Sequence, residues 1–202
     1  MLPALWIARS LNQVRGVMVA GSTVLLALSV YLVFAFLDAR ALDPHSEMLF
    51  VSSVEWFPPL HINYTVGVDG ISVAMLLLSA IITFTGTFAS WQLKPMTKEY
   101  FLWFTLLSMG VFGFFITTDM FAMFMFYEIA LIPMYLLIGV WGSGRKEYAA
   151  MKLTRMLMGG SAFLMCGIFG IFYGAGGQTM NIIDIANHTN GAHAIATNWQ
   201  LI

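Results

Sequence analysis

Glu128 is the residue whose type and position point most directly to chemistry. It stands inside the apolar run 120–141, which contains no lysine or arginine to neutralise it. A carboxyl group at that depth of a bilayer is costly, so such groups usually face a protein interior or a water-filled cavity. Burial favours the protonated carboxyl, whereas a cation on a neighbouring helix favours the ionised form. The position therefore predicts a group that binds and releases a proton, with a purely structural hydrogen bond to a neighbouring helix as the alternative.

Three further residues lie where they could affect Glu128 or its helix. Pro133 removes a backbone donor five residues later and crowds the carbonyl of Ile129, so it predicts a bend that either admits water or is simply tolerated. Tyr135 lies two turns from Glu128 on a similar face, where it orients a water molecule or fills space. Lys152 lies at the membrane edge of the next run, where a snorkelling amine that anchors the helix is the first interpretation.

The elements that must position these residues are membrane spans. The chain has 202 residues, of which 59% are hydrophobic and 9% are charged, whereas a soluble domain usually carries about a quarter charged residues. Its long apolar runs suit a bilayer core of about 30 Å. We therefore expect an all-α, polytopic transmembrane helix bundle with a short N-terminal helix stub at 1–9. The predicted spans are 16–37, 71–93, 100–117, 120–141 and 153–175.

The cationic residues predict how these spans are oriented. Eight of the nine fall on one side of the five spans and only Arg40 falls on the other, so the first side should be cytoplasmic. The eight are Arg9, Arg15, Lys94, Lys98, Arg145, Lys146, Lys152 and Arg155. The segments 38–70 and 176–198 are then outward-facing loops, and the first contains Trp56-Phe57-Pro58-Pro59, which cannot be regular helix. We expect one membrane domain over 1–202, incomplete at both ends, in a bacterial inner (cytoplasmic) membrane.

Small residues predict how the spans pack. Helices in lipid associate through close packing and polar contacts, which favour small side chains at interfaces. The second span carries a stripe of small and hydroxyl-bearing residues that we expect to meet a neighbouring helix, with a water-lined path as the alternative; it consists of Ser79, Thr83, Gly86, Thr87 and Ser90. The fifth span carries a glycine stripe with the same expectation, at Gly160, Gly167, Gly170 and Gly174.

Several function classes find no support in the sequence. The net charge of −1 offers no basic field for nucleic acid. We find no strand-to-helix phosphate loop and no nucleophilic triad, and so no cofactor-binding site. Asp184, His188 and His193 do not match the spacing of a metal site, so we expect no metal in this chain.

The run from Phe126 to Gly142, FYEIALIPMYLLIGVWG, resembles the fifth transmembrane helix of chain M of respiratory complex I, the proton-pumping NADH–quinone oxidoreductase. The mitochondrial counterpart is its subunit 4. Val68-Asp69-Gly70-Ile71-Ser72 and the stretch from Arg145 to Ser161 are similar to the same family. The resemblance covers roughly 60–175. It implies the N-terminal part of the antiporter-like helix fold, as a fragment that would be inactive alone.

The resemblance also implies a function. In this family the glutamate on the fifth helix works with a lysine on the seventh helix while protons move along a hydrophilic axis. Glu128 matches that glutamate, and Lys152 matches a lysine near the start of the sixth helix, which makes it a candidate for the proton pathway. The chain would be one subunit of a translocase that couples quinone reduction to proton transport. NADH, FMN, iron–sulfur clusters and quinone would then be bound by partner subunits.

The implied partners are the other membrane subunits of complex I, of the antiporter-like chain L and chain N types, together with the lipid bilayer. Two other functions stay open at this point. One is a subunit of a multi-subunit sodium/proton antiporter, which shares the helix architecture and the intramembrane glutamate. The other is a structural membrane subunit with no transport role.

Overall fold

Five long helices follow one another along the chain. The computed structural model describes residues 11–42, 48–57, 62–91, 97–174 and 180–189. In these ranges all five helices are long and apolar enough to cross a membrane, which confirms the predicted spans. The stub predicted at 1–9 lies outside the described residues. The helices are α2 (Leu11–Leu42), α3 (Gly70–Ala89), α4 (Thr97–Ile116), α5 (Met120–Trp141) and α6 (Lys146–Gly174).

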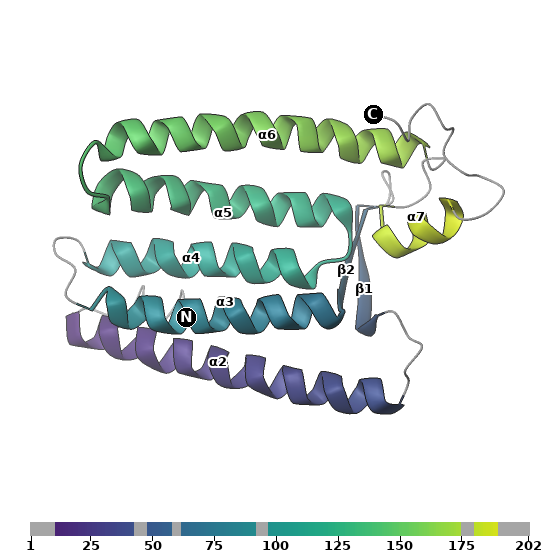
Figure 1. Ribbon diagram of the computed structural model, residues 1–202, viewed down its shortest axis with the longest axis horizontal. Helices are drawn as coiled ribbons and strands as arrows, with labels where there is room; N and C mark the ends of the chain where they lie inside the picture. Colours follow the sequence, from purple (N-terminus) through teal and green to yellow (C-terminus); the bar gives the residue numbers. More distant parts are fainter. Residues whose placement is uncertain (1–10, 43–47, 58–61, 92–96, 175–179, 190–202) are drawn as a thin grey trace.

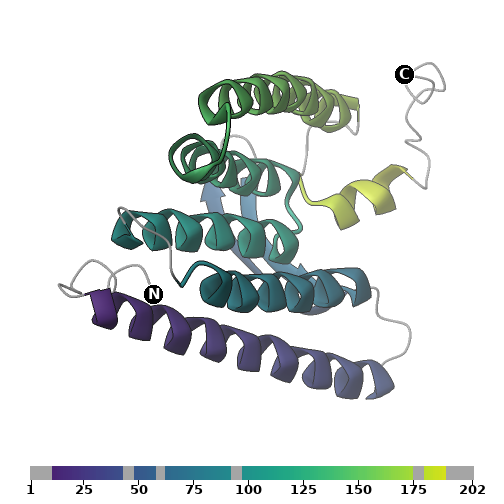
Figure 2. The ribbon, with the colours of Figure 1, turned by 60° about the vertical axis from the view of Figure 1, so that its left-hand side comes forward.

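The long helices lie side by side in the order of the sequence (Figures 1 and 2). Each one contacts the next, and α2 also reaches α4. From α3 to α6 short connections force this arrangement, because helices joined by a few residues pack as antiparallel neighbours. The helix that carries Glu128, α5, is therefore held between α4 and α6.

A β-hairpin and a short helix occupy one end of the bundle (Figure 1). Strand β1 (Leu49–Phe57) pairs antiparallel with β2 (Ile62–Val68), with Ser53 opposite Thr65. The short helix is α7 (Ile182–Thr189). The described parts of the segments 38–70 and 176–198 thus contain two strands and a short helix. The β-branched and aromatic residues before and after the Pro58-Pro59 pair favour the strands. The outward orientation of both segments stays a prediction.

Backbone hydrogen bonds attach the connection between α4 and α5 to this end of the bundle. The N–H of Thr118 donates to the carbonyl of Thr65 on β2 at 2.9 Å. On the other side, the N–H of Met120 donates to the carbonyl of Met180 at 3.0 Å, and the N–H of Ile182 donates to the carbonyl of Thr118 at 3.2 Å. Backbone groups that a helical hairpin would leave open are satisfied here by two distant segments.

Cations gather at the opposite end. Among the described lysines and arginines, only Arg40 lies at the end of the bundle that carries the hairpin. The first residues of α2, α4 and α6 meet at the other end, and they carry Arg15, Lys98, Lys146, Lys152 and Arg155, with Arg145 just before α6. The distribution agrees with the predicted sidedness, in which the cationic end is cytoplasmic.

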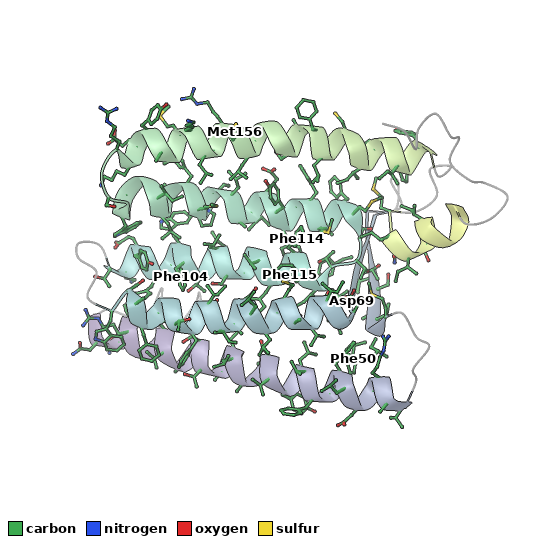
Figure 3. All side chains as sticks on the ribbon, viewed as in Figure 1. Phe50, Asp69, Phe104, Phe114, Phe115 and Met156 are labelled. Atoms are coloured by element: carbon green, nitrogen blue, oxygen red, sulfur yellow. The ribbon has the colours of Figure 1, made fainter. Side chains whose placement is uncertain are left out.

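The hydroxyl stripe of the second span packs against α4, as predicted. Thr83 Oγ1 and Ser108 Oγ are 3.3 Å apart, and Ser90 Oγ and Tyr100 Oη are 2.7 Å apart. Phe104 of α4 (Figure 3) lies against Gly86, where an added Cβ would come within 2.8 Å of its ring. A cavity of 160 Å³ remains between the two helices, next to Ser79, Thr83 and Ser108, so the stripe combines close packing with a small space lined by hydroxyls.

The glycine stripe of α6 behaves differently from the prediction. A Cβ added at Gly160, Gly167, Gly170 or Gly174 would meet nothing within 4 Å among the described residues. In this part of the chain these glycines therefore contact no neighbouring helix. The described residues do not supply the predicted neighbour, because a small residue permits close approach without requiring it.

Candidate functional site: a buried carboxyl between helices

The site is built around Glu128 in the interior of α5. Glu128 is the ninth residue of this 22-residue helix, so it lies at least about 12 Å along the axis from either end of the helix. The side chain is half-buried. Its Oε1 atom is buried and has no hydrogen-bond partner among the described residues. The structure thus places an incompletely satisfied carboxyl group deep in a membrane span, where an unpaired polar atom is costly.

Asp119 sets where this helix begins. Its side chain accepts hydrogen bonds from the backbone N–H of Phe121 at 3.0 Å and of Ala122 at 3.1 Å. The residue has an extended backbone and is completely buried. These are the features of an N-cap, which the sequence pattern predicts for an aspartate before an apolar run. Fixing the first turn fixes the rotation of the helix, and therefore the direction in which Glu128 points.

One face of α5 is pressed against α4. A Cβ added at Gly110 of α4 would come within 2.9 Å of the Ala130 Cβ and 3.0 Å of its backbone nitrogen. A Cβ at Gly113 would collide with the ring of Phe126. Ala130 and Phe126 are four residues apart and mark the face of α5 that meets α4. Glu128 lies on a different face, because a helix turns by about 200° over two residues.

The opposite face of α5 meets α6 and carries Glu128. Phe121 and Phe124 pack against a hydrophobic cluster that includes Ile168 and Phe172 of α6. Near the other end of α5, Gly139 lies against Ala150, with an added Cβ 3.6 Å from that methyl group. Glu128 follows Phe124 by four residues and Phe121 by seven, and it precedes Gly139 by eleven. All of these spacings return to the same helix face, so we infer that Glu128 lies on the side of α5 that α6 contacts.

The structure places the other two predicted residues of α5, Tyr135 and Pro133, on different faces of the helix. Tyr135 lies two turns beyond Glu128 on the same face and is 40% exposed. Pro133 is fully buried, and α5 continues through it without a break. The helical structure of α5 is not interrupted at Pro133, so the role of this residue as a water-admitting bend stays a prediction.

Lys152 does not reach Glu128 in this structure. It is exposed on the second turn of α6, beside Tyr148, Arg155 and Met156, around an open cavity of 290 Å³. It stands at the cationic end of the bundle, which is the position of a membrane anchor. Its part in a proton pathway stays a prediction.

Sequence reasoning did not single out two positions that shape the site. Gly110 brings α4 and α5 into backbone contact, and Ser161 is the buried polar residue of α6. The spacing of Gly110 and Gly113 was a readable signal for a close helix crossing. Ser161 could have been found from its spacing to Ile168 and Phe172, at seven and eleven residues, which places all three on one face. Among the described residues no cluster of potential metal ligands appears.

Together, the fold and the site define an integral, multi-pass membrane protein with an ionisable group inside its helix bundle. Residues 117–202 match the family described as NADH:quinone oxidoreductase/Mrp antiporter, transmembrane region. The chain is 34% identical over 158 residues to NAD(P)H-quinone oxidoreductase chain 4, chloroplastic, of Chara vulgaris, which covers 77% of this chain. The chain belongs to this family and is of the chain 4, or chain M, type.

Solved structures share the fold. A chain of respiratory complex I from Thermus thermophilus with bound NADH superposes with a TM-score of 0.76 at 20% identity, and the match covers 92% of this chain and 36% of that chain. A chain of the membrane-bound sulfane sulfur reductase, an archaeal respiratory membrane complex, gives a TM-score of 0.70 at 24% identity with the same coverage. The chain spans about a third of the length of its curated relative, since it covers 32% of the Chara protein.

Proposed function

We propose that this chain is part of a proton-translocating membrane subunit of an NADH–quinone oxidoreductase of the complex I type, which couples quinone reduction to proton transport. The observation that carries the proposal is the Glu128 carboxyl, deep in α5 and turned toward α6, with one oxygen that lacks a partner among the described residues. Ionisable groups at such a depth in a membrane protein usually mark an ion or proton pathway. Membership of the family supports the same function.

We propose a pathway that runs from the cationic end of the bundle toward Glu128. Lys152 would attract or relay protons at the membrane edge, and Tyr135 would orient water between that edge and the carboxyl group. The two residues lie on the adjoining helices α6 and α5, and both are exposed rather than sealed in the core. Exposed polar groups along one seam are what a chain of water molecules requires.

In this proposal the redox chemistry belongs to other subunits. NADH, FMN, iron–sulfur clusters and quinone would be bound there, and this chain would respond through its charge states. Its partners would be further membrane subunits, including antiporter-like chains of the L and N types. The solved structures with this fold come from multi-subunit membrane complexes, which supports such partners. A bacterial inner membrane stays a prediction, because the Chara vulgaris relative is a chloroplast protein.

The test replaces Glu128 with glutamine in the assembled complex. In inverted membrane vesicles we expect NADH-driven proton uptake to fall by at least about tenfold relative to wild type, since glutamine keeps the shape of the side chain but carries no titratable proton. The matched control is Glu147→Gln, which makes the same chemical change at an exposed position in the first turn of α6. Unimpaired pumping by an assembled Glu128→Gln complex would contradict the proposal and favour a structural subunit.

A sodium/proton antiporter subunit is the second candidate, because the matching family also includes the Mrp antiporters. It predicts sodium-dependent proton exchange without NADH. Genes for redox subunits beside the coding sequence would favour the first proposal, and genes for exchanger subunits would favour the second.

A further inference from the structure

The face of α6 that meets α5 carries one buried polar side chain among its described residues. The buried residues of α6 are Ala150, Ser161, Ile168 and Phe172. They are spaced by eleven, seven and four residues, so they form a single stripe along the helix. Ala150 touches α5 at Gly139, and Ile168 and Phe172 touch it near its start. Ser161 lies between these two contacts and therefore also faces α5.

The register of the two helices sets Ser161 level with Glu128. Gly139 of α5 lies opposite Ala150 of α6. The helices run antiparallel, so eleven residues back along α5 and eleven residues forward along α6 cover the same distance in the same direction. Those steps lead to Glu128 on one helix and Ser161 on the other. A further seven residues along each helix bring Phe121 level with Ile168, and both belong to the hydrophobic cluster at this end of α5.

The chemistry of the two side chains is complementary. Ser161 is only 8% exposed, and its hydroxyl donates to the carbonyl of Met158, one turn earlier in its own helix, at 3.0 Å. The carbonyl of Met158 can also accept a backbone hydrogen bond within α6, so it does not depend on the Ser161 hydroxyl. That hydroxyl can therefore rotate to another acceptor. Oε1 of Glu128 is buried and has no partner among the described residues. A serine hydroxyl can donate to a carboxylate and accept from a carboxylic acid, so it suits both protonation states.

No charged group of the described α6 competes for this place. Lys152 and Arg155 precede Ser161 by nine and six residues and are exposed, so they lie about 14 and 9 Å away along the axis. On the far side of α5, its closest approach to α4 is at Gly110 and Gly113, which have no side chain to offer. Ser161 is therefore the buried polar residue of the described α6 that lies level with Glu128.

We propose that Ser161 is a positioning residue for Glu128: its hydroxyl turns from the Met158 carbonyl to the carboxyl group and holds it through the protonation cycle. The proposal rests on the proposed function for its significance in transport, but the hydrogen bond itself does not depend on that function. It assigns to α6 a direct role in tuning the intramembrane carboxyl, with a neutral hydroxyl rather than a cation as the nearest partner.

The experiment compares Ser161→Ala and Ser161→Thr in the assembled complex. The carboxyl C=O band of Glu128 is assigned by infrared difference spectroscopy as the band that Glu128→Gln removes. We expect Ser161→Ala to move this band to higher wavenumber, as loss of a hydrogen bond does, and to slow proton uptake by about tenfold, the factor for one hydrogen bond to an ionised group. Ser161→Thr keeps the hydroxyl and should restore both. Ser108→Ala is the matched control, because that hydroxyl also donates to a carbonyl of its own helix, Phe104, at 2.9 Å.

The outcomes separate the two proposals. An unchanged Glu128 band in Ser161→Ala would overturn the positioning role, even if Glu128→Gln abolishes pumping. Failure of Ser161→Thr to restore the band would overturn it as well, since the effect would then be one of volume. If the band shifts but Glu128→Gln pumps normally, the hydrogen bond stands and the proposed transport function fails.

Discussion

Two regions of this molecule use glycine in opposite ways. In α4, Gly110 and Gly113 lie where α5 crosses, and the space that a Cβ would occupy is already filled by Ala130 and Phe126. In α6, Gly160, Gly167 and Gly170 face nothing within 4 Å among the described residues. The amino-acid type is the same, and each helix has two of these glycines three residues apart. What differs is whether another backbone lies opposite.

The difference shows where the packing energy of the described bundle resides. In lipid, helices gain little from burying apolar surface and associate through close van der Waals contact. The α4–α5 pair has such contact, at backbone distance, and α5 is the helix that carries the carboxyl group. The outer face of α6 instead exposes large side chains such as Met156, 74% exposed (Figure 3), and Phe163, 81% exposed. Rigidity around Glu128 therefore comes from α4 on one side and from the α6 stripe on the other.

The largest expected effect comes from Gly110→Ala. The new methyl group would meet Ala130 Cβ at 2.9 Å and its backbone nitrogen at 3.0 Å, and the backbone cannot move aside as a side chain can. Forcing α4 and α5 apart should cost about 1–3 kcal/mol. We expect a lower thermal midpoint for the detergent-purified complex and reduced proton uptake. An unchanged midpoint would show that the close crossing is not a source of stability.

A smaller effect is expected from Gly113→Ala. Here the obstacle is the aromatic ring of Phe126, which can rotate, although it also lies 6.1 Å from the ring of Tyr64 in β2. Rotation into a less favoured rotamer should cost about 1 kcal/mol. The double variant Gly113→Ala with Phe126→Leu provides the check: relief of the clash should recover stability, and additive losses would argue against this contact as the cause.

The smallest effect is expected from Gly167→Ala. This position meets no neighbour among the described residues, so the added methyl group should cost nothing in packing and should gain up to about 1 kcal/mol of helix stability. The amount of assembled complex and its thermal midpoint should equal or exceed those of the wild type. A loss of assembly would break the comparison, because it would reveal a neighbour packed on this face.

The membrane spans were predictable because their cause is local. A run of apolar residues must leave water as a helix, whatever its neighbours are, so α5 was predicted at the bounds observed, 120–141. The N-caps depend on equally local contacts: Asp69 accepts a hydrogen bond from the N–H of Ser72 at 2.6 Å, as Asp119 does from the N–H of Phe121. The hairpin of β1 and β2 was harder to predict, since strands need partners and the sequence offered only a short alternating pattern around two prolines.

The candidate site was predictable only in its centre. Glu128 is conspicuous because a carboxyl group is rare in such a run. The pathway residues Tyr135 and Lys152 remain predictions, and the structure places Lys152 about 14 Å along the axis from Ser161. The glycine stripe of α6 finds no neighbour among the described residues, because spacing defines a face but does not supply a neighbour.

The sequence by itself determined that this chain spans a membrane, where its helices run, and that one acidic side chain lies among them. These are properties of single segments in lipid. The tertiary structure alone decided that Glu128 faces α6 rather than α4, that Gly110 is the point of closest approach, and that Ser161 stands level with the carboxyl group. Those facts depend on the rotation and register of one helix against another, and many weak contacts summed along the whole interface set them.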